Sequence, residues 1–106
     1  MAKVNFEQSV IISFNYGNDS LDPLHRLGDR LSYLLDQSDA GYYDGHELAL
    51  DNADGAIFLY GRNAETVYKL IEPELDKVDW MHGAEVTLTF GSNQNAKRIE
   101  FTLEKI

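Results

Sequence analysis

The sequence contains no cysteine, which excludes disulfide bonds, thiolate metal sites and cysteine nucleophiles. It also lacks any run of about 18 apolar residues, the length that a transmembrane helix needs. The N-terminal residues "MAKVNFEQSV" have no apolar segment of signal-peptide length. We therefore expect a cytoplasmic protein.

Basic residues are scarce as well. Nine Lys and Arg stand against 18 Asp and Glu, which gives a formal net charge of −9. This is the wrong sign for holding a phosphate backbone or an anionic lipid surface, so we expect neither nucleic acid nor a membrane as a partner. The hydrophobic fraction of 43% is sufficient for a packed core, and 106 residues suit a single domain that covers residues 1–106.

Hydrophobic periodicity predicts five strands and two helices. Residues 6–16, 86–90 and 99–103 alternate between apolar and polar side chains, as half-buried strands do. Residues 42–50 and 56–60 are predicted to form a hairpin around the turn "DNADG". A leucine stripe predicts a helix that Asp22 caps and Pro23 opens, and a second apolar stripe predicts a helix that Asn63 caps and Pro73 kinks or interrupts after Glu72.

This order of elements predicts an α+β protein with the ferredoxin-like βαββαβ plan and one additional C-terminal strand. With strands numbered along the chain, we expect a five-stranded mixed sheet in the order 5-4-1-3-2, with both helices on one face. The first and third strands are expected to be adjacent and parallel. The apolar run that contains Phe58 and Tyr60 is assigned to the centre of the sheet, with both rings packed in the core.

Four segments carry a resemblance to a known family. They are "YDGHE", "DGAIFLYG", "NAETVYKLIEPEL" and "AEVTLTFG", which lie within residues 41–91. The combination resembles a family of small uncharacterised bacterial domains, in which a strand with Asp-Gly-x-Glu, a strand ending in Tyr-Gly and a helix with an Ile-Glu-Pro step occur together. The resemblance implies the same fold plan and brings no catalytic residue with it.

The strongest indication of a partner is a run of acidic residues between Arg30 and Arg62, which contains no basic residue and carries −6 of the net charge. We hypothesise a docking surface for a basic protein, of the kind that an inhibitor, immunity protein or adaptor uses, with two tyrosines as anchors. The alternative is that the acids only protect an exposed sheet edge from unwanted pairing. The residues proposed for this surface are Asp36, Asp39, Tyr42, Tyr43, Asp44, Glu47, Asp51 and Asp54.

Catalytic and metal sites are weakly supported. Asp44, His46 and Glu47 lack a third ligand in recognisable spacing, so no metal and no other cofactor is expected. His46 is interpreted as a structural histidine, with a general base oriented by Asp44 or Glu47 as the alternative; Gly45 is a position at which a bulge could change the face to which the ring points. No nucleophile accompanies it, so a binding protein is favoured while an enzyme stays open.

The sheet face away from the helices is predicted to be polar and mildly acidic. Its members are expected to be Glu7, Ser9, Ile11, Ser13, Asn15, Glu85, Thr87, Thr89, Glu100 and Thr102. A solvated face accounts for this pattern. The alternatives are a homodimer, formed through this face or through an edge strand, and a surface for another partner. Three functions therefore stay open: a protein-binding module, a self-associating structural domain, and a small-molecule binder or enzyme that uses this face or His46.

Overall fold

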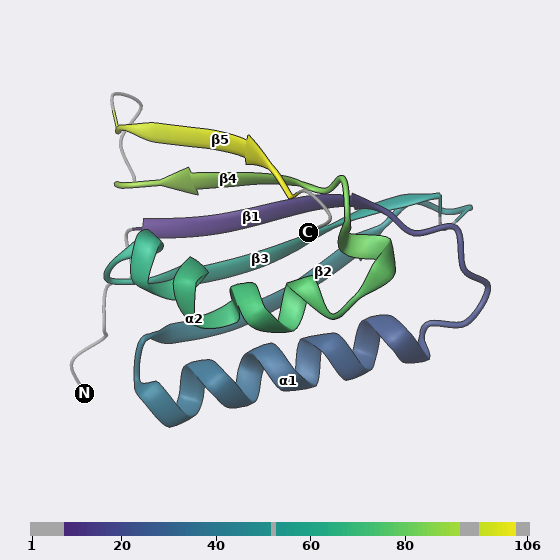
Figure 1. The fold of residues 1–106 in the computed structure, drawn as a ribbon, viewed down its shortest axis with the longest axis horizontal. Coiled ribbons are helices and arrows are strands. Elements are labelled where there is room, and N and C mark those ends of the chain that lie inside the picture. Colours follow the sequence, from purple (N-terminus) through teal and green to yellow (C-terminus); the bar gives the residue numbers. More distant parts are fainter. Residues whose placement is uncertain (1–7, 52, 92–95, 104–106) are drawn as a thin grey trace.

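A computed structural model describes residues 8–51, 53–91 and 96–103 of the chain. The elements follow one another as β1 (Gln8–Asn15), α1 (Asp22–Ser38), β2 (Gly41–Leu48), β3 (Asp54–Gly61), α2 (Ala64–Asp76), the short 3-10 helix η1 (Asp79–Met81), β4 (Glu85–Thr89) and β5 (Arg98–Thr102). The five strands form a sheet, and Figure 1 shows both helices on the same side of it. The structure is therefore an α+β fold of two layers, as the periodicity predicts.

The strand order is β2-β3-β1-β4-β5, which is the predicted order read from the opposite edge. All four neighbouring pairs are antiparallel, including β1 with β3. The prediction of a mixed sheet with β1 parallel to β3 is therefore wrong. The β2–β3 hairpin reverses the chain between the two helices, so β3 must run against the direction that β1 and β2 share.

The core lies between the sheet and the helices. Alternate residues of β1 and β3 point into it, and the leucines of α1 and the apolar stripe of α2 cover them. Its largest fully buried side chains are Ile12, Leu24, Leu31, Leu35, Ile57, Leu59, Ile71, Leu75, Met81, Val10, Val67 and Val86. Figure 1 shows α1 beneath the β2 side of the sheet and α2 beside it.

The face assignment within β3 corrects the expectation that Phe58 and Tyr60 pack in the core. Ile57 and Leu59 are the fully buried residues of this strand, whereas Phe58 and Tyr60 are half-buried. Because side chains alternate along a strand, Phe58 and Tyr60 point to the face that the helices leave open. The strand β3, which lies between β1 and β2, thus carries apolar side chains on both faces, although only one of these faces packs in the core.

The helix ends match the sequence signals in part. The Asn63 side chain accepts a hydrogen bond from the backbone N–H of Thr66 at 3.0 Å, which confirms Asn63 as the cap of α2. Helix α1 begins one residue earlier than predicted, with Leu21 rather than Asp22 in the capping position. Of the two predicted effects of Pro73, the interruption after Glu72 is wrong, because α2 continues through Pro73 to Asp76 with Leu75 buried in the core. The kink stays a prediction.

Among the described residues, no helix combines the length and the apolar character that crossing a membrane requires.

Candidate protein-binding face

The face of the sheet that the helices leave open carries an aromatic centre. Strand register aligns Tyr42 of β2 with Tyr60 of β3, and Tyr60 with Ser9 of β1. The rings of Tyr42 and Tyr60 stack with centroids 5.5 Å apart and an angle of 29° between their planes. The next row places Phe58 beside Ile11. These four side chains form a continuous apolar strip, and Tyr42 is 42% exposed within it.

A β-bulge in β2 decides which of its side chains reach this face. Tyr43 pairs with Leu59 and His46 with Ile57, so two residues of β2, Asp44 and Gly45, face one residue of β3. Gly45 has a φ of 102°, a backbone conformation that glycine adopts without strain. The bulge leaves Tyr43 and His46 both on the helix side, where the buried Ile57 and Leu59 lie.

Carboxylates outnumber basic side chains around the aromatic strip; among the described strand residues the basic one is Arg98 of β5, which shares the cross-strand row of Tyr60, Ser9 and Thr89. Asp44 is exposed and lies near Tyr60; burial raises the pKa of the Tyr60 phenol, and the negative charge of Asp44 raises it further. Glu47 pairs with Ala56 and so stands on the same open face. The strands at the opposite edge of the sheet, β4 and β5, contribute two further carboxylates to the same face. Glu85 pairs with Ser13, and Glu100 pairs with Thr87, which in turn pairs with Ile11.

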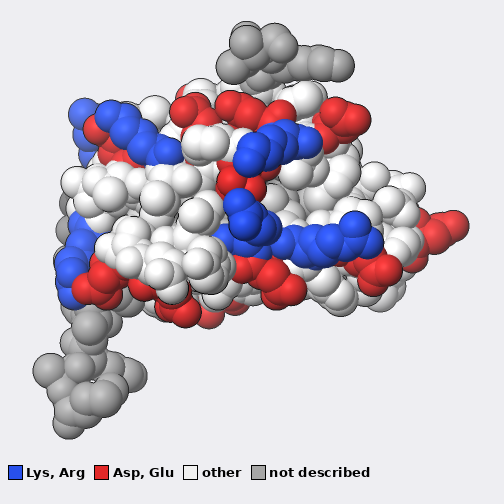
Figure 2. Space-filling model, turned by 60° about the horizontal axis from the view of Figure 1, so that its bottom comes forward, with Lys and Arg blue, Asp and Glu red and all other residues white. Residues whose placement is uncertain are grey.

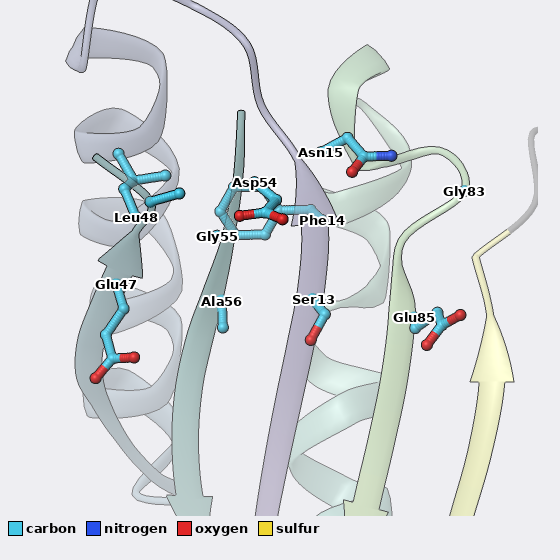
Figure 3. A pocket seen from close by; sticks show the side chains of 11 residues that line it. Ser13, Phe14, Asn15, Glu47, Leu48, Asp54, Gly55, Ala56, Gly83 and Glu85 are labelled. Carbon is cyan, nitrogen blue, oxygen red and sulfur yellow. The ribbon is translucent and has the colours of Figure 1, made fainter. Parts of the chain in front are cut away.

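One end of the open face is hollowed. A shallow pocket of about 550 Å³ lies over the ends of β1, β2, β3 and β4. Figure 3 shows Glu47 and Glu85 on opposite sides of it, with Asp54 and Ser13 between them. Of the described residues that line the pocket, none is basic. Because three carboxylates line this concave surface, its potential is negative and favours a cationic group.

The predicted docking residues do not form one patch. Tyr42, Asp44, Glu47 and Asp54 lie on the open face or at its edge, as described above. Asp36 lies in the last turn of α1, and Asp39 follows the helix in the left-handed conformation, both exposed beyond the sheet.

Asp51 belongs to the β2–β3 turn, where its Oδ1 accepts a hydrogen bond from the backbone N–H of Ala53 at 3.0 Å. Asn52 of the same turn lies outside the described residues.

Tyr43 is placed against α1 instead of facing a partner. A Cβ built on Gly28 of this helix would lie 2.8 Å from the Tyr43 hydroxyl, so the ring packs on the glycine. The hydroxyl is also 3.1 Å from Nδ1 of His46. Burial raises the pKa of Tyr43 to about 12, with a smaller contribution from the charge of Asp29. Tyr43 therefore serves the contact between α1 and β2.

The surroundings of His46 favour the structural interpretation. Its Nδ1 bonds to Tyr43, and its ring lies 5.6 Å from the ring of His25 on α1. Glu47 points to the opposite face of the strand and is not positioned to orient this imidazole. Within the described parts of the chain, no group of three or more His, Asp or Glu residues could hold a metal ion.

Sequence reasoning missed the aromatic centre. It placed Tyr42 in the docking region and Phe58 and Tyr60 in the core, although the hairpin register alone pairs Tyr42 with Tyr60. The signal was present in the alternation of "AIFLY": if Ile57 and Leu59 face the helices, Phe58 and Tyr60 must face away.

In comparisons with known proteins, no protein-family model, no curated protein and no solved structure matches the chain.

Proposed function

We propose that the chain is a small acidic protein-binding module that docks a basic protein through the open face of its sheet. The observation that carries this proposal is the aromatic strip of Tyr42, Tyr60, Phe58 and Ile11 with carboxylates on both sides. Aromatic anchors within a charged rim are the usual composition of a protein-binding surface.

Charge complementarity specifies the chemistry of the partner. Asp44 and Glu47 approach the strip from β2, and Glu85 and Glu100 from β4 and β5. A partner with Lys or Arg side chains around an apolar patch would be steered to this face and then held by the tyrosines. An inhibitor, immunity protein or adaptor is the type of molecule that works in this way, and it needs no cofactor.

We also propose a fold plan, a protein family and a cellular location for the chain. The strand order and the two helices on one face support a ferredoxin-like plan extended by β5. The segments of residues 41–91 support membership of the small bacterial family that they resemble. A cytoplasmic location fits the sequence, which has no long apolar run.

The test compares baits that differ only in the charge of the proposed face. Wild-type protein and the double variant Asp44→Lys, Glu85→Lys are immobilised, and proteins captured from a lysate of the native cell are quantified by mass spectrometry. Both side chains are exposed, so the variant is expected to fold with a stability within about 0.5 kcal/mol of the wild type.

We expect a basic protein that the wild type captures and the double variant loses. Its capture should weaken as added salt shortens the Debye length below about 8 Å.

The matched control is Asp29→Lys, Asp76→Lys, which reverses two exposed charges on the helices and should retain the same partner. Equal capture by both double variants would contradict docking through the open face.

A further inference from the structure

The strand β5 forms one edge of the sheet, and among the described residues no strand pairs with its outer side. Figure 1 shows it as the outermost strand on the side away from β2. The β2 edge is interrupted by the bulge at Asp44 and Gly45, a feature that hinders pairing with a further strand. In contrast, β5 pairs with β4 along all of Arg98–Thr102 without a shift in register. A regular edge of this kind is a template for another strand.

The hydrogen bonds to β4 determine which backbone groups of β5 point outward. At one end of the ladder the N–H of Phe90 donates to the carbonyl of Lys97 at 2.9 Å, and at the other end the N–H of Leu103 donates to the carbonyl of Ala84 at 2.8 Å. Hydrogen-bonded pairs alternate with non-hydrogen-bonded pairs along an antiparallel ladder. The odd-numbered residues of β5 therefore bond to β4. The backbone groups that point to the free edge belong to Arg98, Glu100 and Thr102.

The side chains of β5 differ between its two faces. Arg98 and Glu100 are exposed on the open face, and neither forms a salt bridge with another described residue. On the helix side Ile99 is 39% exposed. The Phe101 ring on the same side packs on Tyr68 of α2, with ring centroids 5.0 Å apart. The edge thus presents one positive and one negative side chain on one face and apolar side chains on the other.

The two charges select one register for a second copy of β5. If two copies pair antiparallel about a two-fold axis at Arg98 or at Glu100, that residue lies opposite its own equivalent, and like charges directly opposite each other are destabilising. An axis at Phe101 places Glu100 opposite Thr102 and forms no ion pair among the described residues. An axis at Ile99 places Arg98 opposite Glu100 on both sides of the axis. The outward backbone groups of these two residues also match in that register.

We propose that two copies of this chain associate through β5, antiparallel and about a two-fold axis at Ile99. Arg98 of each copy pairs with Glu100 of the other, and each such pair exchanges two backbone hydrogen bonds. The two Ile99 side chains meet at the axis on the helix side, where neighbouring side chains of a non-hydrogen-bonded pair come closest. The two sheets join edge to edge, with both open faces on the same side.

This association goes beyond the docking of a basic protein and does not rest on it. Glu100 is neutralised by Arg98 of the second copy, whereas Asp44, Glu47 and Glu85 stay on the open face of each copy. The purified chain therefore tests the association without any other protein present.

The first experiment measures the mass of the purified full chain by sedimentation equilibrium from about 1 µM to about 1 mM, the range in which so small an interface dissociates. We expect the mean mass of the wild type to rise with concentration towards that of a dimer. Arg98→Glu and Glu100→Arg each set like charges opposite one another and should raise the dissociation constant about tenfold or more. Glu100→Arg also reduces the net negative charge, so general repulsion between copies predicts the opposite effect for this variant.

The matched control carries both substitutions in one chain. Arg98→Glu, Glu100→Arg keeps the net charge of −9 and restores opposite charges across an axis at Ile99, so it should associate as the wild type does. Circular dichroism verifies that every variant is folded. A wild type that stays monomeric up to about 1 mM would overturn the proposal, and a double variant that associates no better than the single variants would overturn the register.

A single introduced cysteine locates the axis, because the chain has no other thiol. Ile99→Cys places two thiols at a non-hydrogen-bonded pair, in which the Cα atoms are about 4.5 Å apart and within reach of a disulfide. Thr102→Cys is the matched control on the same exposed edge, because its two copies lie about 20 Å apart in this register. We expect mild oxidation to convert Ile99→Cys, and not Thr102→Cys, to a covalent dimer. Equal cross-linking of the two variants would contradict an axis at Ile99.

Discussion

Gly28 on α1 offers a direct test of where Tyr43 points. Replacing glycine by alanine inside a helix ordinarily stabilises a protein by up to about 1 kcal/mol, because alanine loses less backbone entropy on folding. Here the new Cβ would lie 2.8 Å from the Tyr43 hydroxyl oxygen and 3.0 Å from the ring carbon that carries it. Both distances are shorter than ordinary van der Waals contact, so the ring must move.

The movement has a cost that can be worked from the contacts. Tyr43 can retreat only by stretching its hydrogen bond of 3.1 Å to His46, and such a bond contributes about 1 kcal/mol. Lost packing of the half-buried ring adds to this. We therefore expect Gly28→Ala to destabilise the wild-type protein by about 0 to 1 kcal/mol instead of stabilising it.

The matched background is Tyr43→Ala, which opens the space above Gly28. In that background Gly28→Ala should regain the full helix advantage of about 1 kcal/mol. Urea unfolding of the four proteins gives a double-mutant cycle, with an expected coupling of about 1 to 2 kcal/mol. If Gly28→Ala stabilises both backgrounds equally, Tyr43 does not pack on α1 and could return to the docking surface.

Two further predictions concern the sheet and the helix pair. Leu59→Ala should destabilise the protein by about 2–5 kcal/mol, and Phe58→Ala by less than half as much, because only Leu59 is fully buried; equal losses in urea unfolding would contradict the face assignment. Hydrogen bonds from Arg30 and Lys77 lower the pKa of Glu74, so its carboxylate stabilises the fold above its unfolded pKa and loses that effect as pH falls. The advantage of wild type over Glu74→Gln in thermal unfolding should therefore be present at about pH 7 and should shrink as the pH falls below about 4. A constant difference would refute the ion pairing.

Much of the fold follows from local signals. Alternation along residues 8–15 predicts the buried Val10, Ile12 and Phe14, and the turn residues predict the hairpin between β2 and β3. The strand order is also predicted correctly. The direction of β3 is predicted wrongly: the hairpin makes β3 antiparallel to β2, and β3 is therefore also antiparallel to β1, which runs in the direction of β2.

The candidate surface is harder to predict, because a bulge in β2 changes which of its side chains point to each face of the sheet. The sequence marks Gly45 as a position where a bulge can occur, but it does not show which neighbouring side chains would change face. With the bulge in place, Tyr42 faces outward, Tyr43 turns to α1 and His46 still points to the helix side. One inserted residue decides which tyrosine can contact a partner, and composition alone does not contain that information.

Net charge alone does not describe this molecule, because its two layers carry different mixtures of charge. The open face carries Asp44, Glu47, Glu85 and Glu100, with Arg98 as the only basic residue among the described strand residues, whereas Figure 2 shows basic and acidic side chains side by side over the helices. A partner responds to the potential of the surface that it approaches, so under the proposed function the carboxylates of the open face, and not the overall charge of −9, steer a basic protein.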